Sequence, residues 1–554
     1  MNAELLLAHY DRISDAPDAV ARLRKFILDL AVRGKLVEQK SDDESAEKLM
    51  RRITINRSTA IGHVSSLSIR FTPSEPEPFN LPSNWTWARL GLICSKTGSG
   101  STPRGGKSVY QQHGVPFLRS QNVYNDGLRL DDVAYIADET HEHMSGTAVE
   151  PGDLLLNITG GSIGRCCLVP QEMNQANISQ HVAIIRVALD GIQYYLHKLV
   201  LSPYFQSFVL SEQTGAGRLG LPKNKMDLIA VALPPLPEQH RIVAKVDELM
   251  VLCDQLEASR REQETRREQL TASAHHHLNN GDDADGLRTH AQFFIGHLPR
   301  LTKRPDQIKQ LRQTILNLAI RGKLVPQDSS DTPAIQFLGN RRLLNDLEIE
   351  PWSLPSGWAW SSMAKIGETL GGGTPSKGEP KFWNGSIPWV SPKDMKVDLI
   401  KDAKDHISEL AIEGSATRLI PTHSLLMVVR GMILAHSFPT AITDVPVTIN
   451  QDMKAIVPFH QDLIQYLLLL TKGLKPEILN LVQHSTHGTC KLLTDELFSL
   501  PIPIAPLAEQ HRIIAKVDEL IALCDKLEAS LCTAKTETSR LLESVLHHAL
   551  EASA

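Results

Sequence analysis

Residues suited to contact nucleic acid gather in glycine-containing loops that carry few acidic side chains. Lysine and arginine pair with phosphate groups, and arginine, glutamine and asparagine can form two hydrogen bonds to one base edge. The candidate DNA-binding residues are Arg104, Lys107, Arg119, Gln121, Asn122, Arg218, Lys223, Lys225, Lys377, Lys381, Lys393, Arg430, His487 and Lys491. We expect Gln121, Asn122 and Arg218 to read bases and the lysines to anchor phosphates. The alternative for any one of them is a solvated surface charge or a turn residue.

The sequence contains none of the motifs that would let the chain itself modify or cleave DNA. An amino-methyltransferase would carry (D/N/S)-P-P-(Y/F/W), and the nearest stretch, LPPL at residues 233–236, lacks both the polar and the aromatic residue. The stretch GSTPRGGKS at residues 100–108 has Ser101 where a phosphate loop requires glycine. Histidines at the ends of two predicted helices fit a favourable charge at a helix C-terminus better than a metal site. We therefore expect no catalytic residue, metal ligand or bound cofactor in this chain.

Charge and cysteine content limit the class of protein. The 58 basic and 63 acidic residues give a net charge of −5, so positive charge for nucleic acid must be concentrated on particular loops. The seven cysteines form no CxxC pair, which argues against a zinc site and favours a reducing cytoplasm. The most apolar run, at residues 464–474, is too short to span a bilayer, and the N-terminus does not resemble a signal peptide. We expect a soluble cytoplasmic protein without a membrane partner.

The elements that position these loops occur twice. The stretch PLPEQHRIVAKVDELMVLCDQLEAS at residues 235–259 returns as PLAEQHRIIAKVDELIALCDKLEAS at residues 506–530, with five differences. The stretch LRKFILDLAVRGKLV at residues 23–37 likewise returns as LRQTILNLAIRGKLV at residues 311–325. Such a long period indicates a duplicated domain-sized unit.

The repeated stretch at residues 235–259 predicts a helix of about 40 residues whose apolar side chains recur every 3.5 residues, as in paired helices. The helix-pairing residues are Ile242, Val246, Leu249, Cys253 and Leu256 in one copy and Ile513, Val517, Leu520, Cys524 and Leu527 in the other. We expect the two seams to pack against each other in antiparallel fashion; the alternative is a seam that docks on its own globular block. We expect the polar residues that are identical in both copies to be exposed and to bind two identical partner proteins. They include Glu238, Gln239, Arg241, Lys245, Asp247 and Glu248. A recent duplication could also explain their identity.

Short β-rich runs between the helical stretches predict an α+β fold. The expected organisation is a helical region at 1–80, a globular block at 81–234, a long helix at 235–280, a linker at 281–305, a repeated helical region at 306–350, a second block at 351–505 and a second long helix at 506–554. The blocks begin alike, with LPSNWTWARLG and LPSGWAWSSMAKIGE, but their interiors diverge. That pattern favours one scaffold with two reading surfaces. Gln180 and Gln451 occupy equivalent positions in the blocks and are interpreted as scaffold residues.

The motif P-x-x-E-Q-x-x-I-x-x-x-(V/I)-(D/E)-x-L, met at Pro235 and Pro506, and the paired divergent blocks resemble the specificity (S) subunit of type I restriction-modification systems. The resemblance implies two pseudo-twofold-related target-recognition domains separated by two long antiparallel coiled-coil helices. Each domain would read one half of an asymmetric bipartite target in double-stranded DNA, and the helices would fix the spacing. It also implies a non-catalytic subunit that holds two methyltransferase (M) subunits and is joined by restriction (R) subunits. S-adenosylmethionine, ATP and magnesium would bind those partners.

Two other classes of function remain open at this point. The net negative charge and the near-neutral blocks are compatible with a coiled-coil adaptor that assembles other subunits without reading DNA. A methyltransferase or nuclease in its own right is disfavoured by the missing motifs.

Overall fold

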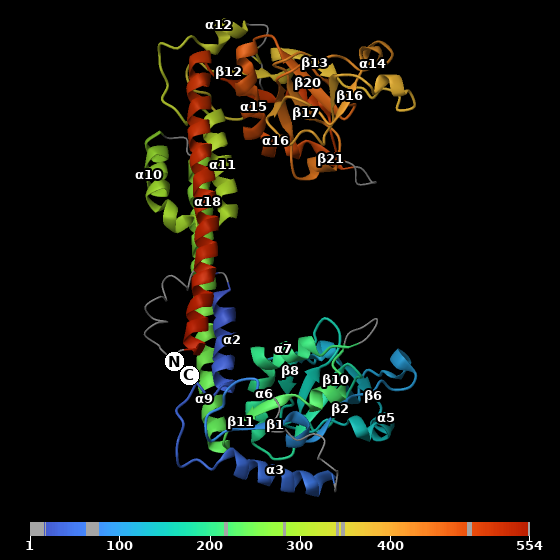
Figure 1. Ribbon diagram of the computed structural model, residues 1–554. Helices are drawn as coiled ribbons and strands as arrows, with labels where there is room; N and C mark the ends of the chain where they lie inside the picture. Colours follow the sequence, from blue (N-terminus) through green and yellow to red (C-terminus); the bar gives the residue numbers. More distant parts are fainter. Residues whose placement is uncertain are drawn as a thin grey trace. The chain divides into compact units, whose positions relative to one another are not determined.

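The computed structural model describes residues 16, 18–61, 77–214, 220–280, 284–339, 343–344, 350–484 and 490–551. The chain divides into two compact units, Met1–Gln263 with Lys535–Ala554, and Glu264–Ala534. Each unit contains one globular block, the first part of the long helix that follows it and the last part of the other long helix (Figure 1).

The first block is closed by its own ends, because β1 (Thr86–Arg89) pairs in antiparallel fashion with β11 (Ala230–Leu233). An antiparallel sheet follows the order β2 (Cys94–Ser99), β10 (Val182–Val187), β7 (Leu154–Asn157), β8 (Cys166–Leu168). A second sheet joins β6 (Ala134–Ile136), β3 (Val115–Leu118) and β9 (Asn177–Ile178), and β4 (Val123–Tyr124) pairs with β5 (Gly127–Leu128). Alternate residues of β7 enter two core clusters, Leu154 and Leu156 one and Leu155 the other, so both faces of the first sheet are covered.

Short helices surround these sheets. They are α4 (Leu90–Ile93), α5 (Asp138–His143), α6 (Ile192–Leu201), α7 (Pro203–Ser211) and α8 (Lys223–Asp227), with 3₁₀ turns at Gly106–Val109, Ser120–Asn122 and Ser145–Thr147. Before the block lie α2 (Ala19–Val32) and α3 (Ala46–Ile61). Leu49 and Ile53 of α3 are buried in the core of this unit, although the sequence around them is mostly polar.

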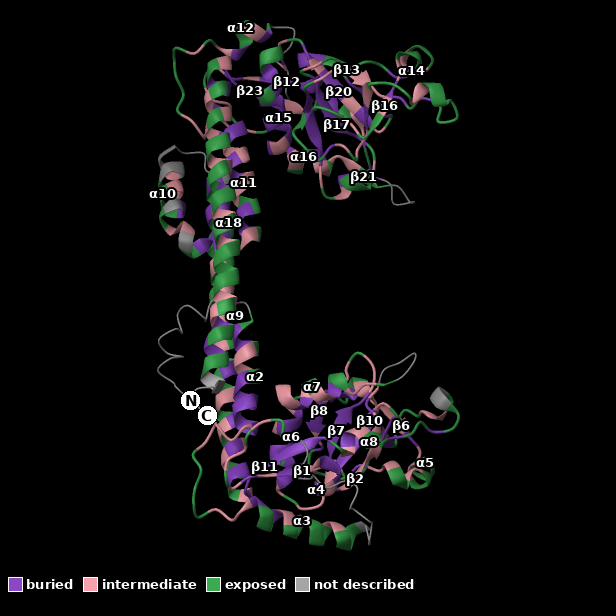
Figure 2. Ribbon diagram, viewed as in Figure 1, coloured by how far each residue is buried: buried purple, intermediate pink, exposed green. Residues whose placement is uncertain are grey.

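The second block repeats this scaffold. Its ends pair through β12 (Ala359–Ser362) and β23 (Pro501–Ile504), and its larger sheet has the order β13 (Gly367–Gly371), β20 (Met453–Pro458), β17 (Leu425–Val428), β18 (Thr440–Thr443), β15 (Leu399–Ile400). The smaller sheets are β16 (Asp405–Ile407), β14 (Ile387–Val390), β19 (Thr448–Ile449), and β21 (Val482–His484) with β22 (Cys490–Leu492). The register is the same in both blocks, because Val182 pairs with Asn157 as Met453 pairs with Val428. The strands of both blocks are mostly buried (Figure 2).

The helices of the second unit correspond to those of the first. They are α11 (Pro305–Ile320), α12 (Ala334–Leu338), α13 (Met363–Ile366), α14 (Glu409–Glu413), α15 (Ile464–Gly473), α16 (Lys475–Asn480) and α17 (Thr494–Ser499), with 3₁₀ turns at Pro380–Phe382, Met432–Ala435 and Gln461–Leu463. No helix in the described part of the chain is long and apolar enough to cross a membrane.

Two helices of 45 residues, α9 (Leu236–Asn280) and α18 (Leu507–Glu551), follow the blocks. The first part of the α9 seam, Ile242, Val246 and Cys253, is buried in one cluster with α2 and the first block, and Leu249 and Leu256 pack on its edge. In the second unit Ile513, Val517 and Cys524 are buried with α11 and the second block, and Leu520 and Leu527 pack on the edge of that cluster. These parts of the seams therefore pack within their own units. This agrees with the alternative expectation, in which each seam docks on its own globular block. Pairing of α9 with α18 stays a prediction.

Polar residues in the first turns of α9 and α18 dock the helices on their own units. Glu238 accepts a hydrogen bond from Gln39 at 2.6 Å, and Glu509 accepts one from Gln327 at 2.8 Å. Burial raises the pKa of both glutamates. Arg241 pairs with Asp43 at 2.6 Å as Arg512 pairs with Asp331, and the hydrogen bond from Arg241 lowers the pKa of Asp43.

The expectation that these helix-start residues face partner proteins is therefore wrong for three of them. Glu238 is 1% exposed and Gln239 is fully buried, and the Gln239 side chain donates to the carbonyl of Pro234. Arg241 is held by Asp43. The physical reason is that the segment after α2 covers the first turn of α9, where Gln39 and Asp43 supply polar partners for Glu238 and Arg241. Identical intramolecular docking thus explains part of the near-identity of the two stretches.

The interpretation of residues 281–305 as a linker is also wrong for most of that range, because it contains α10 (Ala284–Leu301). Phe294 and Leu301 of α10 are buried in one cluster with Ala274 and Leu278 of α9, and Leu311 of α11 packs against it. The apolar side chains around Phe294 give this segment a face to bury, which outweighs the low helix propensity of the glycines within it, Gly286 and Gly296.

Candidate nucleic-acid interface

In the first block, loops meet where β2 and β7 end and β10 begins. Gly100 donates its backbone N–H to Val182 at 2.9 Å, Ile158 to His181 at 3.0 Å, and Ser179 to Leu118 at 2.9 Å. We call this surface loop cluster 1; its residues are 100–108, 119–122, 157–165, 179–181, 214 and 220–222. Loops joined by many backbone hydrogen bonds form a fixed platform, and such loops are common sites of binding.

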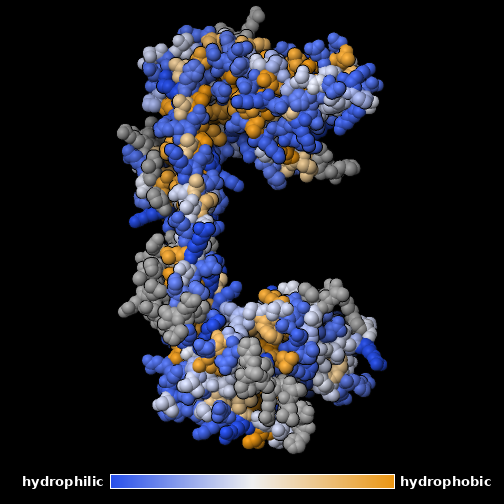
Figure 3. All heavy atoms as spheres, viewed as in Figure 1, coloured by the Kyte–Doolittle hydropathy of each residue, from blue (hydrophilic) through white to orange (hydrophobic). Residues whose placement is uncertain are grey.

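The second block has an equivalent loop cluster 2, made of residues 372–378, 391–394, 429–436, 450–452 and 490–491. Gly373 donates its N–H to Ile449 at 2.9 Å, Asn450 to Val390 at 3.0 Å, and Gly431 to Cys490 at 2.9 Å. The two clusters therefore place different sequences on one backbone framework. On the face drawn in Figure 3, the surface of both blocks is largely hydrophilic, with scattered apolar patches.

Five of the predicted cations lie in these clusters with exposed side chains and pair with no described residue. They are Arg104 in loop cluster 1 and Lys377, Lys393, Arg430 and Lys491 in loop cluster 2. A solvated cation on a fixed loop is suited to a phosphate contact. Lys491 lies on β22 beside Arg430, to which it is bridged through the backbone.

The structure separates the neighbours Gln121 and Asn122. Gln121 is exposed and donates to the Asp132 carboxylate at 2.5 Å. Asn122 is 2% exposed, accepts from the Arg119 backbone N–H at 3.0 Å and donates to the Arg129 carbonyl at 2.9 Å. The prediction that Asn122 reads a base is therefore wrong, because both its amide oxygen and its amide nitrogen form hydrogen bonds within the loop.

The remaining described candidates have intramolecular partners. The Arg119 guanidinium donates to the Asp132 carbonyl at 2.9 Å. Three lysines among the candidates form ion pairs: Lys223 with Asp227 at 2.5 Å, Lys225 with Glu212 at 2.8 Å and Lys381 with Glu379 at 3.5 Å. Such exposed pairs are weak, so these cations remain compatible with a phosphate contact. The side chain of Lys107, and all of Arg218 and His487, lie outside the described residues.

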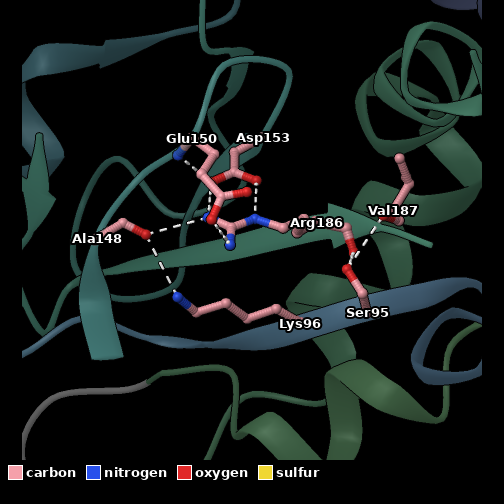
Figure 4. A network of polar contacts seen from close by, with 7 residues as sticks. All are labelled: Ser95, Lys96, Ala148, Glu150, Asp153, Arg186 and Val187. Atoms are coloured by element: carbon pink, nitrogen blue, oxygen red, sulfur yellow. Dashed lines mark hydrogen bonds and ion pairs between the residues drawn. The ribbon is translucent and has the colours of Figure 1, made fainter. Parts of the chain in front are cut away.

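A second polar network in the first block lies toward the opposite end of the four-stranded sheet (Figure 4). Arg186 of β10 binds both oxygens of the buried Asp153 at 2.7 and 2.8 Å and also pairs with Glu150. Lys96 of β2 donates to the Ala148 carbonyl at 3.4 Å, and its pKa is lowered by burial and by Arg186. Lys96 is a residue of β2 opposite Arg186 and lies outside loop cluster 1.

The sequence pattern led us to interpret Gln180 and Gln451 as scaffold residues, and Arg165 was not among the candidates. Gln180 is exposed in loop cluster 1 and has no partner among the described residues. Gln451, its counterpart, is exposed and accepts a hydrogen bond from Thr374, as a scaffold residue would. Arg165 lies 4.6 Å from the centre of the Tyr124 ring. The signal for Gln180 was its place two residues before the buried strand β10. In the described part of the chain no group of three or more His, Cys, Asp or Glu side chains could hold a metal ion.

Comparison with known proteins gives a consistent result. The family model described as "Type I restriction modification DNA specificity domain" matches residues 82–265 and 355–533. The Escherichia coli protein "Type I restriction enzyme EcoAI specificity subunit" is 26% identical over 570 aligned positions, which cover 96% of this chain and 94% of that protein. The EcoR124I/EcoR124II specificity subunit of the same species is 39% identical over 173 residues, 31% of this chain and 43% of that protein. The HsdS subunit crystal structure from Thermoanaerobacter tengcongensis covers 86% of this chain and 99% of its own, with 19% identity and a TM-score of 0.44.

Proposed function

We propose a function from the premise that the chain belongs to the type I restriction modification DNA specificity family, whose model matches more than half of its length. This membership confirms the resemblance drawn from the helix motif and the paired blocks. The chain is a DNA sequence-recognition subunit of a type I restriction-modification system, and each block is a DNA target-recognition domain. The observation that carries this conclusion is the double match, one copy over each block.

Each domain reads one half of an asymmetric bipartite target through its loop cluster. Equivalent positions support this proposal. The backbone N–H of Ser391 donates to the Asp394 carboxylate at 2.8 Å, and the backbone N–H of Arg119 donates to the Asn122 side chain in the same way. These positions therefore shape the loop in both domains. The exposed residue between them is Gln121 in one domain and Lys393 in the other. The same framework thus offers a hydrogen-bonding amide to one half-site and a cation to the other.

The long helices set the spacing between half-sites by pairing as an antiparallel coiled coil. Contacts within the first unit support this. Arg24 of α2 binds Asp254 of α9 at 2.5 Å, and Arg22 donates to the Ser539 carbonyl of α18 at 3.5 Å. One short helix thus contacts the first part of α9 and the last part of α18, as expected if the long helices run side by side in opposite directions.

The chain is a non-catalytic cytoplasmic subunit that docks two methyltransferase subunits, with restriction subunits in the full complex. The absence of methyltransferase and nuclease motifs from its sequence supports this assignment. S-adenosylmethionine, ATP and magnesium would then act on the partner subunits. The duplicated helix surface supports two equal docking sites.

The test is to purify the chain with its methyltransferase subunit and to map methylated bases on plasmid DNA by single-molecule sequencing. We expect one asymmetric bipartite motif, and sequence-selective binding of duplexes that contain it at moderate salt. A complex that assembles but shows no preference among sequences would overturn DNA recognition and favour an adaptor. Methylation by this chain alone would overturn the non-catalytic assignment.

A further inference from the structure

Two apolar side chains stand exposed on loop cluster 2. After β17 the chain turns through Arg430 and Gly431 into a 3₁₀ turn, Met432–Ala435. Met432 is 65% exposed and Ile433 is 42% exposed, whereas the next residue, Leu434, is 1% exposed. We call Met432 and Ile433 the apolar tip. Two adjacent apolar side chains exposed on a loop surface are available for a contact outside this chain.

Backbone contacts hold the apolar tip in place. Gly431 has a φ of 133°, which favours glycine, and it donates its N–H to the Cys490 carbonyl at 2.9 Å. Arg430 donates its N–H to Asp452 at 3.2 Å, and Leu434 closes the turn by donating to Gly431 at 3.1 Å. A tip fixed in this way cannot readily turn its apolar side chains inward. It is presented to a ligand at little entropic cost.

Cations flank the apolar tip. Arg430 lies two residues before it, separated from it by Gly431, and Lys491 is bridged to Arg430 through the backbone. Both side chains are exposed, as are those of Lys393 and Lys377 in the same cluster. Some DNA-binding proteins combine basic residues that bind phosphates with an apolar side chain that contacts or inserts between bases. The apolar tip and its flanking cations have the same combination of residue types. This combination fits a nucleic-acid duplex better than an apolar protein surface.

The first domain carries a different surface at the same position. Its bridge between Thr159 and Gly220 corresponds to the bridge between Arg430 and Lys491. The residues that follow Thr159 are Gly160, Gly161 and Ser162, so neither the apolar side chains nor the two cations are present. The Thr159 hydroxyl is 2.7 Å from Nδ1 of His181. The apolar tip therefore belongs to the second domain and is not part of the shared scaffold.

We propose that the apolar tip contacts bases of the half-site read by the second domain, while Arg430 and Lys491 bind the flanking phosphates. The inference rests on the proposed DNA-recognition function and adds specificity-determining residues to it. The first domain reads its half-site without such a contact. Recognition of the two half-sites is then asymmetric in mechanism as well as in sequence.

The test compares the wild-type complex with its methyltransferase subunit and the double variant Met432→Ala/Ile433→Ala. Binding is measured by competition against duplexes that carry every single base-pair change in the mapped target. We expect the double variant to lose about tenfold in discrimination at one or two adjacent positions of one half-site, the usual scale for one base contact. Discrimination in the other half-site, and assembly with the methyltransferase subunit, should be unchanged.

Two further variants sharpen the result. Arg430→Ala should weaken binding to all sequences alike and lower the slope of log affinity against log salt by about one. Phe459→Ala is the matched control, because Phe459 is 54% exposed but lies just beyond the far end of β20. It should bind and discriminate as the wild type does.

Unchanged discrimination in the double variant would overturn the inference, and so would an equal loss in both half-sites. Loss of methyltransferase assembly would make the apolar tip a protein-docking surface and would overturn it too. Failure of the proposed function is distinguishable, because the wild-type complex itself would then show no sequence preference. Thermal unfolding of the variants checks that their fold is intact.

Discussion

At the residue scale, adjacent side chains on one loop have separate tasks. Asn122 accepts from the backbone N–H of Arg119 and donates to the carbonyl of Arg129, whereas the exposed Gln121 side chain donates to Asp132. In the second domain Asp394 repeats the first task, by capping Ser391, and Lys393 stands in place of Gln121. The loop-shaping position and the reading position can thus be told apart by comparing the two domains.

We predict that Asn122→Ala destabilises the first domain by about 1–3 kcal/mol, because it removes buried hydrogen bonds and leaves their partners unsatisfied. Gln121→Ala should leave stability within about 0.5 kcal/mol of the wild type and change base preference in one half-site. Thermal unfolding of the full chain and duplex competition measure the two effects. An unfolding temperature lowered equally by both substitutions would contradict the division of tasks.

A buried histidine distinguishes the first domain from the second. Burial lowers the pKa of His197 to about 4, although its Nε2 lies 3.0 Å from the Cys166 carbonyl. The two domains align at Tyr195 and Tyr466, whose hydroxyls bond equivalent carbonyls, so Leu468 is the counterpart of His197. Leu468 is also buried.

Because the folded pKa of His197 is below the unfolded value, the unfolded chain binds this proton first as the pH falls. The first domain should therefore lose stability from about pH 6.5 downward, by about 3 kcal/mol at pH 4. His197→Leu, which copies the second domain, should remove this contribution. Hydrogen-exchange protection of α6, compared between wild type and variant at each pH from 7 to 5, measures it. An equal fall in protection in both proteins would count against His197.

At the element scale, each long helix has a face that its own unit does not use. Lys245, Glu248 and Leu252 of α9 are repeated as Lys516, Glu519 and Leu523 of α18. Leu252 is 46% exposed and Leu523 is 52% exposed. Spacings of three, four and seven residues place these side chains on one side of a helix. Intramolecular docking explains Glu238, Gln239 and Arg241, but it does not explain an identical exposed leucine, which fits a partner bound twice.

We predict that Leu252→Glu removes one of two methyltransferase subunits, that Leu523→Glu removes the other, and that the double variant binds neither. A charge placed at the centre of an apolar contact typically costs several kcal/mol of binding. Native mass spectrometry of co-purified complexes gives the stoichiometry. Leu228→Glu, at a leucine that is 40% exposed in the first block, is the control and should retain both subunits. Two subunits on the double variant would contradict this docking surface.

At the scale of the whole molecule, each domain is closed by its own first and last strands. Thr86 pairs with Leu233 and Ala359 with Ile504, so chain entry and exit lie side by side in each domain. The main core clusters of the two units share no residue. A domain built in this way can be exchanged without disturbing the core of the other.

We predict that exchanging residues 81–234 for the first recognition domain of another family member changes one half of the target and preserves the other half and the spacing. Methylome sequencing of cells that carry the hybrid chain gives the sequence of each half-site and the length of the spacer. A changed second half would show that the domains do not read independently. If the spacer length changed while both half-sites stayed the same, the long helices would not be the sole determinant of the spacer length.

The sequence alone determined the duplication, the long helices, the α+β blocks and the family, because repeats and periodicity are properties of order along the chain. What covers each surface became visible only in the folded chain. Glu238 is buried by Gln39, which is 199 positions away, and the seam of α9 is covered by α2 and the first block. The helix α10 and the buried amide of Asn122 have the same origin. Burial depends on which distant segments meet, and identical residues in two copies do not reveal whether they face solvent, a partner or the chain itself.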